Sequence, residues 1–325
     1  MILTRSDVRS LLDIDACIDA VRDGFLAQAS GRALASGVLG THVDGGGFHV
    51  KTSGLASRRR YFAAKVNANF PGNRLLHGLP TIQGVIALYD ATNGVLLALM
   101  DSTEITTLRT AAATAVAAQH LARSDSATVT VIGCGVQGRS QLLALSRVRS
   151  IAFATAYDSH VRTARDYAEE MSRVIGCTVE PVDDYRAAAR KTDIIVTCTS
   201  ARAPVLGKAD IREGTFIAAV GADSEVKQEL DPSLLASSKV VVDVLEQCAT
   251  IGDLHHAIDA GVMRREDVHA ELSDVVSGRR PGRESDTEVI VFDSTGTALE
   301  DVAAASFVYE RALKADARLE ISLIS

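Results

Sequence analysis

The segment TVTVIGCGVQGRSQLLAL, residues 128–145, carries the strongest structural signal in this chain. It opens with five β-branched residues, continues as Gly133-x-Gly135-x-x-Gly138, and ends in a run that suits a helix. A strand, such a glycine turn and a helix in this order are typical of a unit that binds a dinucleotide. Asp158 supports this interpretation, because it ends the next strand-like run about 20 residues further on.

The three glycines have separate tasks in this pattern. Gly133 permits a tight turn, Gly135 lets the backbone approach a pyrophosphate, and Gly138 lets the helix and the sheet pack closely. We expect the free amides around Val136 and Gln137, together with the helix dipole, to hold the pyrophosphate.

Asp158 bears on the choice of cofactor. At the end of its strand, Asp158 can accept hydrogen bonds from the adenosine ribose hydroxyls and repel a 2′-phosphate. We therefore predict NAD as the cofactor, with NADH preferred over NADPH. Arg162 is close enough in the sequence to weaken that preference. The alternative is a glycine-rich turn in which Asp158 only caps the following helix.

The second half of the chain repeats the alternation of strand and helix. Short, nearly continuous apolar runs lie at residues 127–132, 151–157, 193–197, 216–220, 240–244 and 289–292. Strands that are apolar on both faces and are joined by helices form a parallel sheet that helices cover on both sides. The predicted class is α/β, with a doubly wound Rossmann sheet over residues 121–299.

The two ends of the chain predict a second, discontinuous domain of α+β type. Asp13 can cap a helix that ends at Gly31, and strands follow from about residue 37 to residue 101, with a hairpin turn at Asn93-Gly94. An alanine-rich helix over 106–122 precedes the sheet, and a last helix over 298–315 follows it. We expect residues 1–120, completed by 300–325, to form a substrate-binding and dimerisation domain.

The composition excludes several classes of protein. With 34 Lys+Arg against 41 Asp+Glu and no tryptophan, the chain lacks the basic surface of a nucleic-acid-binding protein. No run approaches the ~18 apolar residues of a membrane span, and charges interrupt the first residues where a signal peptide needs an apolar stretch. The five scattered cysteines predict buried thiols in a reducing cytoplasm and no metal site. These features favour a cytoplasmic enzyme.

Several motifs, taken in order, resemble the ornithine cyclodeaminase/μ-crystallin family. They are KVNANFPGN with GLPTIQG (65–84), EITTLRTAAATAVAAQHLA (104–122), VIGCGVQG (131–138), AAVGADSEVKQELD (218–231), GDL (252–254) and VFDSTGTALEDVAAA (291–305). The resemblance implies a Rossmann domain and a second domain that builds a homodimer. The family includes cyclodeaminases, NAD-dependent alanine dehydrogenases, imine and ketimine reductases, opine-like synthases and hormone-binding crystallins.

The resemblance also implies which residues react. Lys65 and Arg109 would hold the substrate carboxylate, with Lys65 counted as catalytic and Arg109 also close to the cofactor; arginine offers a planar fork that matches a carboxylate. Without the family, Lys65 fits a solvated lysine of an edge strand, and Arg109 fits a salt bridge on a helix surface. Asp223, which follows the apolar run 216–220, would be the acid/base beside the nicotinamide.

Other positions are assigned by the resemblance alone. It implies that the dinucleotide is lined by Thr81, Thr199, Val220, Gly221, Lys227 and Ser294, and that the substrate contacts Thr295. His255 and His256 have no partner at metal-ligand spacing, so we expect them at the surface or at a helix cap.

One departure from the cyclodeaminases bears on the substrate. Residues 45–89 contain no Asp or Glu, whereas the cyclodeaminases carry a glutamate upstream of the Lys65 position. An unpaired buried ammonium is costly, so a diamino acid such as ornithine is disfavoured. Lys51 offers a second anion contact and would admit a dicarboxylate such as iminosuccinate. We interpret Arg58, Arg59 and Arg60 as a solvated loop.

The leading hypothesis is therefore an NAD(H)-dependent imine reductase or amino-acid dehydrogenase, which interconverts an imino or keto acid and an L-amino acid. The alternatives are a cyclodeaminase that recycles its NAD and a binding protein that resembles μ-crystallin. The expected partners are a small imino or amino acid and a second copy of the chain, with no nucleic acid and no membrane.

Overall fold

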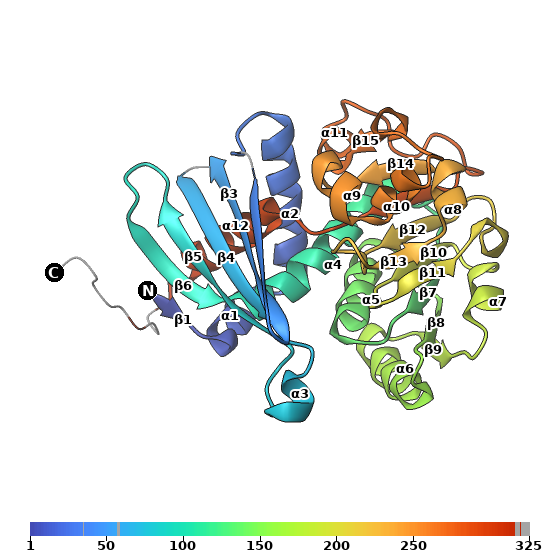
Figure 1. Cartoon of the computed structure of the whole chain (residues 1–325), viewed down its shortest axis with the longest axis horizontal. Coiled ribbons are helices and arrows are strands. Elements are labelled where there is room, and N and C mark those ends of the chain that lie inside the picture. Colours follow the sequence, from blue (N-terminus) through green and yellow to red (C-terminus); the bar gives the residue numbers. More distant parts are fainter. Residues whose placement is uncertain (35, 57–58, 316–318, 320–325) are drawn as a thin grey trace. The chain divides into compact units, whose positions relative to one another are not determined.

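The computed structural model describes residues 1–34, 36–56, 59–315 and 319, and it divides into two compact units (Figure 1). The terminal unit comprises Met1–Arg109 and Thr297–Ser325, and the central unit comprises Thr110–Gly296. The first boundary lies inside helix α4 (Ser102–Leu121), whereas the sequence analysis placed it after residue 120. The second boundary precedes helix α12 (Ala298–Ala312), whereas the sequence analysis placed it after residue 299.

The central unit contains an eight-stranded parallel sheet in the order β15-β14-β16-β12-β10-β7-β8-β9. Its strands are β7 (Thr128–Ile132), β8 (Phe153–Tyr157), β9 (Thr178–Pro181), β10 (Ile194–Thr197), β12 (Phe216–Ala219), β14 (Lys239–Val242), β15 (Ala270–Glu271) and β16 (Ile290–Asp293). The strand order reverses between β7 and β10, and ligands of such sheets bind at this point, beyond the carboxyl ends of the strands. The predicted doubly wound α/β class is confirmed.

Helices and a small second sheet complete the central unit. The helices are α5 (Val136–Val148), α6 (Val161–Ile175), α7 (Tyr185–Ala189), α8 (Pro232–Ala236), α9 (Leu245–Ile251), α10 (Asp253–Asp259) and α11 (Leu272–Val276). Strands β11 (Arg202–Leu206) and β13 (Gln228–Leu230) pair in parallel beside the main sheet.

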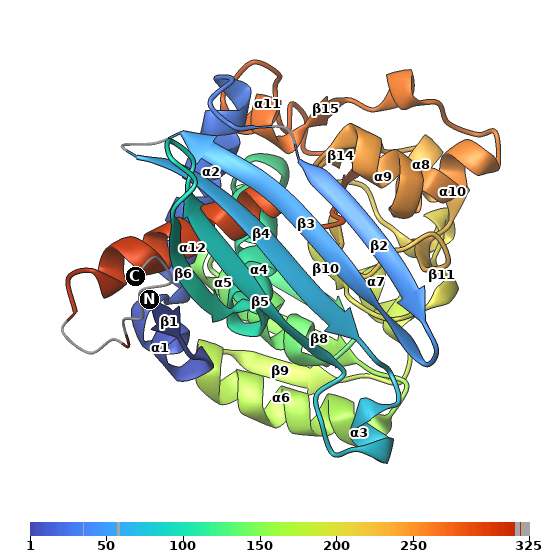
Figure 2. The ribbon, with the colours of Figure 1, turned by 60° about the vertical axis from the view of Figure 1, so that its left-hand side comes forward.

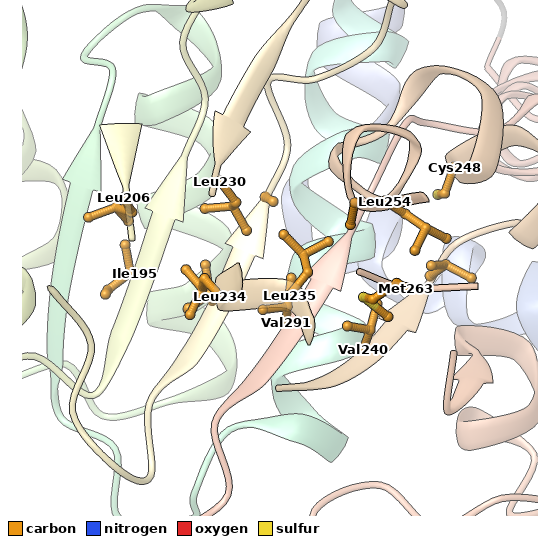
Figure 3. Close-up of a cluster of buried hydrophobic side chains, with 14 of the residues drawn as sticks. Ile195, Leu206, Leu230, Leu234, Leu235, Val240, Cys248, Leu254, Met263 and Val291 are labelled. Carbon is orange, nitrogen blue, oxygen red and sulfur yellow. The ribbon is translucent and has the colours of Figure 1, made fainter. Parts of the chain in front are cut away.

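Every residue of β10, β12 and β16 is buried, as expected for strands that are covered on both faces. Their side chains join those of the helices in an apolar cluster that includes Ile195, Leu206, Leu230, Leu234, Leu235, Val240, Leu254, Met263 and Val291 (Figure 3). Full burial of each such side chain contributes about 1.5–3 kcal/mol. The cluster therefore anchors the strands from whose ends the loops of the site start.

The terminal unit contains a six-stranded sheet in the order β1-β6-β5-β4-β3-β2, antiparallel except for the parallel pair of β1 and β6. Its strands are β1 (Ile2–Leu3), β2 (Gly37–Val43), β3 (Gly46–Ala56), β4 (Arg60–Asn69), β5 (Ile82–Asp90) and β6 (Leu96–Asp101). Its helices are α1 (Arg5–Leu11), α2 (Ile14–Ala29), α3 (Asn73–Leu76) and α12, which packs against β3, β4, β5 and α2 (Figure 2).

Local sequence explains where these elements begin and end. The Asp13 side chain accepts a hydrogen bond from the Ala16 amide and caps α2, and Gly31, with a φ of 69°, follows its end. Gly94 adopts a φ of 77° in the turn between β5 and β6, so a glycine is favoured there. The predicted helix caps and hairpin are therefore present.

The terminal sheet has one covered face and one open face. On β4, Ala63 and Lys65 are buried beneath α12, whereas the alternate residue Val66 points to the other face and is 38% exposed. Pairing between strands aligns Val66 with Val50 on one side and Val85 on the other, and Val50 with Leu39. The open face therefore carries an apolar row across four strands.

Some expectations about single residues and short segments can also be compared with the structure. The five cysteines are free thiols, three of them buried and two partly so. Arg59 is not part of a solvated loop, because its guanidinium lies 2.6 Å from the carboxylate of Asp90; Arg58 lies outside the described residues. In the described part of the chain, no helix is both long enough and apolar enough to cross a membrane.

Candidate active site

The glycine turn follows β7 and leads into α5. A Cβ atom at Gly133, where φ is 105°, would lie 2.7 Å from the carbonyl oxygen of Cys198, and one at Gly138 would lie 2.2 Å from the carbonyl oxygen of Gly133. The packing of the protein itself therefore requires these two glycines. A Cβ atom at Gly135 would meet no described atom within 4 Å, so protein packing does not explain this glycine. Close approach of a pyrophosphate to the backbone would explain it, and the turn fits a dinucleotide.

The start of α5 supports the same conclusion. Gly135 caps the helix without any side-chain hydrogen bond, so no side chain satisfies the amides of the first turn. Val136 is exposed, and the buried Oε1 atom of Gln137 has no hydrogen-bond partner among the described residues. An uncapped helix N-terminus of this length suits an anionic phosphate.

Asp158 directly follows β8 and contacts the glycine turn. Its Oδ2 atom accepts a hydrogen bond from the Cys134 amide at 3.0 Å, and its Oδ1 atom accepts one from the His160 amide at 2.9 Å. Asp158 therefore stabilises both the glycine turn and the chain entering α6. The alternative that Asp158 only caps α6 does not hold, because His160 is the N-cap residue and, among the described residues, no side chain caps this helix; the Asp158 carboxylate stays at the end of the strand.

A cavity of about 280 Å³ opens beside this carboxylate. Its lining includes Asp158 together with Arg165 and Asp183, which the sequence analysis did not single out. Arg162 is not among the residues that line it; this side chain is 93% exposed, with its guanidinium 3.8 Å from Asp166. The basic residue nearest to Asp158 at this cavity is thus Arg165, not Arg162.

Two buried acids that sequence reasoning missed hold the loops beyond the strand ends. Glu229 accepts hydrogen bonds from the amides of Thr199 and Gly221, at 2.6 Å and 2.8 Å, and so joins the loops after β10 and β12. Asp243 accepts hydrogen bonds from the amides of Thr295 and Gly296, at 2.8 Å and 2.7 Å. These two acids fix the backbone amides of Thr199, Gly221 and Thr295, three of the positions expected to line the dinucleotide or the substrate.

The neighbouring loop residues share this arrangement. The amide of buried Val220 donates to the carbonyl of Thr197, and the hydroxyl of Ser294 lies 3.4 Å from Asp243. Thr81, in the terminal unit, precedes β5, and its carbonyl accepts a hydrogen bond from the Phe70 amide.

Asp223, the expected acid/base, is an exposed residue. Its carboxylate lies 2.6 Å from the Nζ atom of Lys227, four positions later, and its side chain is 55% exposed. His256 lies with Nε2 2.8 Å from the carbonyl oxygen of Lys227, and His255 pairs with Asp259 on α10. The two histidines thus serve the local structure, and among the described residues no group of His, Cys, Asp and Glu could hold a metal.

Lys65 and Arg109 are both buried in the terminal unit, contrary to the alternatives of an edge lysine and a surface salt bridge. Lys65 lies on β4 opposite Lys51 of β3, and Arg109 lies on α4. The Nζ atom of Lys65 is 2.6 Å from Asp301 Oδ2, and the Nε atom of Arg109 is 3.0 Å from Asp301 Oδ1. One carboxylate thus bridges the two expected substrate-binding cations.

A second acid completes this group, which we call the paired cluster: Lys65, Arg109, Glu300 and Asp301. Glu300 Oε2 lies 2.7 Å from Arg109 Nη1, while Glu300 Oε1 accepts a hydrogen bond from the Thr297 amide at the start of α12. Glu300 therefore belongs both to the cluster and to the capping box of its helix.

Burial and pairing act in opposite directions on these charges. Burial lowers the pKa of Lys65 to about 7, and the attraction of Asp301 only partly offsets that effect. Burial alone would raise the pKa of Asp301, but Lys65 and Arg109 hold it below its usual value. Asp301 is therefore ionised at neutral pH, while Lys65 is poised between its two protonation states.

The acids of this cluster correct one inference from the sequence. The absence of Asp and Glu from residues 45–89 suggested that no acid would pair with the ammonium of a diamino acid, yet Glu300 and Asp301 of α12 lie beside Lys65 and Arg109. The argument against a diamino acid therefore cannot rest on that stretch alone. Two adjacent acids inside an alanine-rich, apolar helix were the signal that could have revealed them.

Several known proteins are similar to this chain in sequence and in fold. Alanine dehydrogenase of Archaeoglobus fulgidus is 40% identical over 316 residues, which cover 96% of this chain and 95% of the relative. A solved archaeal alanine dehydrogenase dimer with bound NAD has a TM-score of 0.95 at 38% identity, covering 100% of this chain and 99% of that one. The Δ(1)-pyrroline-2-carboxylate reductase of Thermococcus litoralis, in complex with NADH and L-proline, has a TM-score of 0.92 at 38% identity, covering 97% and 98%.

The match to a family extends over almost the whole sequence. Residues 1–316 match the model of the ornithine cyclodeaminase/mu-crystallin family. This range includes the glycine turn, the paired cluster and the loops that Glu229 and Asp243 hold. The chain belongs to the ornithine cyclodeaminase/mu-crystallin family.

Proposed function

We propose that the protein is an NADH-dependent imine reductase or amino-acid dehydrogenase, which interconverts an α-imino or α-keto acid and the corresponding L-amino acid. The observation that carries the proposal is the burial of Lys65 and Arg109 together in the terminal unit, each within 3.0 Å of one carboxylate oxygen of Asp301. Buried cations that already contact one carboxylate of the protein are well suited to bind the carboxylate of a substrate.

The broad class of the enzyme follows from its relatives. Alanine dehydrogenase and Δ(1)-pyrroline-2-carboxylate reductase both act on carbon–nitrogen bonds, as their names state. The protein is an NAD-dependent oxidoreductase of this class. Its own substrate is the part of the function that is proposed.

The proposed chemical roles rest on the resemblance to the family and on the chemistry of the side chains. Nicotinamide, when bound, supplies or accepts the hydride. Lys65 and Arg109 hold the substrate carboxylate and so orient the carbon that reacts. The ionised carboxylate of Asp223 stabilises a positively charged iminium and exchanges a proton with its nitrogen. Lys227, whose Nζ atom is 2.6 Å away, fixes that carboxylate between reactions.

The cofactor is proposed to be NAD(H) rather than NADP(H). Asp158 and Asp183 both line the cavity where the adenosine is expected; with Arg165 as the only cation among the described residues that line it, the two carboxylates would repel a 2′-phosphate. Arg162, which could have weakened this preference, pairs instead with Asp166.

The proposed substrate is a small imino or amino acid with one or two carboxylates. In the paired cluster, two acids balance the charges of Lys65 and Arg109, and Lys51 adds a third cation from the neighbouring strand. A monocarboxylate needs one of these cations, whereas a dicarboxylate such as iminosuccinate would also engage Lys51. The role of Lys51 therefore separates the two substrate classes.

A panel of substrates tests the proposal. We would follow NADH absorbance with pyruvate and ammonia, with Δ(1)-pyrroline-2-carboxylate, and with oxaloacetate and ammonia, and repeat each assay with Lys51→Met. Net consumption of NADH supports the proposed reaction. Ammonia release from a diamino acid without net change in NADH would instead show a cyclodeaminase, and no turnover of any compound would favour a binding protein.

The proposed assembly is a homodimer formed by the terminal unit. Leu39, Val66 and Val85 leave 62%, 38% and 48% of their surfaces exposed on the open face of the sheet, and an apolar row of this kind suits a self-complementary interface. The solved alanine dehydrogenase relative is described as a dimer. A monomer by light scattering at micromolar concentration would contradict this assembly, and Val66→Glu should weaken it.

A further inference from the structure

Four carboxylates of the central unit are completely buried without a cation. Glu229 of β13, Asp243 after β14, Asp253 of α10 and Asp293 of β16 are each 0% exposed. Within the described residues, none of them takes part in an ion pair. A buried ionised carboxylate normally needs a cation or several hydrogen bonds, so this group needs a physical explanation.

Three of these acids are connected through the backbone, each binding the amide of the next. Asp293 accepts hydrogen bonds from the amides of Asp253 and Leu254, at 3.3 Å and 2.9 Å. Asp253 Oδ1 in turn accepts from the amides of Glu229 and Leu230, at 2.8 Å and 2.9 Å. We call Asp293, Asp253 and Glu229 the acid relay. Leu230 and Leu254 also belong to the apolar cluster, so the relay is anchored in the core (Figure 3).

The relay ends at the loops expected to contact the dinucleotide. Its last member, Glu229, holds the amides of Thr199 and Gly221. A Cβ atom at Gly221 would lie 2.5 Å from the Glu229 carboxylate, so only glycine allows this close contact. The position of both loops therefore depends on the position and charge of one buried carboxylate.

The relay also explains the GDL motif, for which the sequence suggested no role. A Cβ atom at Gly252 would lie 2.5 Å from Asp293 Oδ2, Asp253 is the middle acid, and the amide of Leu254 donates to Asp293. All three residues of the motif are thus part of one hydrogen-bonded connection.

The surroundings of Asp253 favour its protonated form. The titratable groups that face Asp253 are Glu229 from β13 and Asp293 from β16. Asp243 and, on α9, Cys248 lie beyond Asp293. Helix α8 has no titratable side chain, whereas α10, the helix of Asp253 itself, also carries His255, His256 and Asp259. The Oδ2 atom of Asp253 is buried and has no hydrogen-bond partner among the described residues. Burial raises the pKa of Asp253 to about 7, and the charge of Glu229 adds to this effect.

Burial raises the pKa of the other two relay acids as well. For Asp293, the charge of Asp253 contributes after burial, whereas for Glu229 the hydrogen bonds from the amides of Thr199 and Gly221 partly oppose the rise. The three acids therefore carry protons more readily than ordinary carboxyl groups at neutral pH.

We propose that the acid relay is a proton-dependent positioning device, in which protonated Asp253 lets Glu229 hold the Thr199 and Gly221 loops in the form that binds the dinucleotide. Loss of the proton places negative charges side by side without a cation, so the loops loosen and the affinity for the cofactor falls. The inference rests on the proposed function, because it assumes that NADH binds at these loops. It makes Asp253 a positioning residue, since it reaches the loops only through Glu229.

Asp253→Asn is the sharpest test, because Asp253 Oδ1 alone accepts both backbone hydrogen bonds. Asparagine keeps the accepting oxygen Oδ1 and has an NH₂ group in place of Oδ2, the oxygen without a partner among the described residues. It therefore imitates the protonated acid but cannot ionise. We would measure the Kd of NADH by fluorescence between about pH 6 and pH 9. We expect the wild-type Kd to rise about five- to tenfold over this range and the Asp253→Asn value to stay within about twofold.

Two further variants separate charge from structure. Asp253→Ala removes the hydrogen bonds and should weaken NADH binding at every pH. Glu169→Gln, an exchange of an exposed acid that pairs with Arg173 on α6, should follow the wild-type profile. A wild-type pH profile in Asp253→Asn would overturn the relay, and so would a wild-type Kd that does not change with pH.

A measurement on the unmodified protein keeps the proposal testable if the variants do not fold. NADH binding above about pH 7 should take up a proton, which calorimetry in buffers of different ionisation enthalpy detects. Binding without proton uptake overturns the relay alone. Failure to bind NADH at any pH overturns both the relay and the proposed function.

Discussion

The paired cluster and the acid relay bury carboxylates in opposite ways. In the terminal unit, Asp301 and Glu300 lie within 3.0 Å of Lys65 or Arg109, and Asp301 is kept ionised by these cations. In the central unit, Asp253 lacks a cation and is held by backbone amides, and its pKa is raised to about 7. The paired cluster stabilises the ionised form of its carboxylates, whereas the acid relay stabilises the protonated form.

This difference shows how one chain can bind an anion and still keep its loops ordered. Internal acids allow cations to be buried without leaving an unpaired charge. Acids that bind amides instead order the backbone, because their oxygens satisfy donors in loops, in β13 and at the start of α10. Neither arrangement supplies a solvent-accessible acid, and the acid/base proposed above, Asp223, is an exposed residue.

The largest expected effect follows from this division. If the buried acids only position other groups, Asp223→Asn should lower turnover by ~10²–10⁴-fold, the usual contribution of general acid–base catalysis. NADH binding should change little, because Asp223 is an exposed residue outside the glycine turn. Steady-state rates at saturating NADH, with NADH titrations as the control, measure both. Turnover within a few-fold of wild type would refute the assignment.

The second-largest expected effect is on the free energy of unfolding, which should respond differently to substitutions in the paired cluster and in the acid relay. Asp301→Asn leaves Lys65 and Arg109 without their shared carboxylate, which should cost about 3–5 kcal/mol in the free energy of unfolding. Asp253→Asn should not cost stability at about pH 8, because an amide at this site avoids the buried negative charge. Urea unfolding of both variants provides the comparison, and an equal loss in both would contradict it.

The sign of the pH dependence follows from the raised pKa of Asp253. In the unfolded chain this acid titrates near its ordinary value of 3.8, and in the folded protein near 7. Asp253 therefore contributes fully to the free energy of unfolding below its pKa in the unfolded chain, and this contribution is lost as the pH rises through its folded-state pKa of about 7. In Asp253→Asn, this part of the dependence should be absent.

Lys65 should give a smaller effect on substrate affinity. Its pKa of about 7 means that the lysine loses its charge as the pH rises above neutrality. We expect kcat/KM to fall by about tenfold per pH unit above this value, through a rising KM. Lys65→Arg keeps its charge throughout and should show no such fall. The same profile in both proteins would mean that another group titrates.

The smallest expected effect concerns the cofactor. Asp158→Ser should improve the use of NADPH relative to NADH by about fivefold, because the carboxylate is only partly shielded from water. Arg162→Ala is the matched control and should leave the ratio unchanged, since this side chain points away toward Asp166. Initial rates with each cofactor give the ratio. An NADPH preference in the unmodified protein would refute the role of Asp158.

Much of the fold could be predicted from local sequence. The strands of the central sheet are short β-branched runs buried on both faces, so their positions and their parallel arrangement follow from the pattern itself. The missed strands β9 and β11 are mostly exposed and carry no continuous apolar run, and β1, β13 and β15 have only two or three residues. Their pairing depends on neighbours that lie far away in the sequence.

The site was harder to predict, because its partners come from distant segments. The motifs singled out Lys65 and Arg109, but the acids that balance them lie far along the chain in α12; Glu300 is 191 positions after Arg109. Glu229 and Asp253 occur in motifs that matched the family, yet their function depends on amides brought near them only by folding. Residue type and spacing do not reveal which buried acid pairs with a cation and which accepts hydrogen bonds from backbone amides.

Glu300 gives the paired cluster an unusual constraint on its evolution. One oxygen of this side chain contacts Arg109, and the other helps to start α12, the helix against which the terminal sheet packs. A change that alters what Arg109 can bind therefore also disturbs the nucleation of a core helix. New substrate preferences should consequently arise through residues that face the cluster from other strands, such as Lys51, while position 300 tolerates little variation in any selected library.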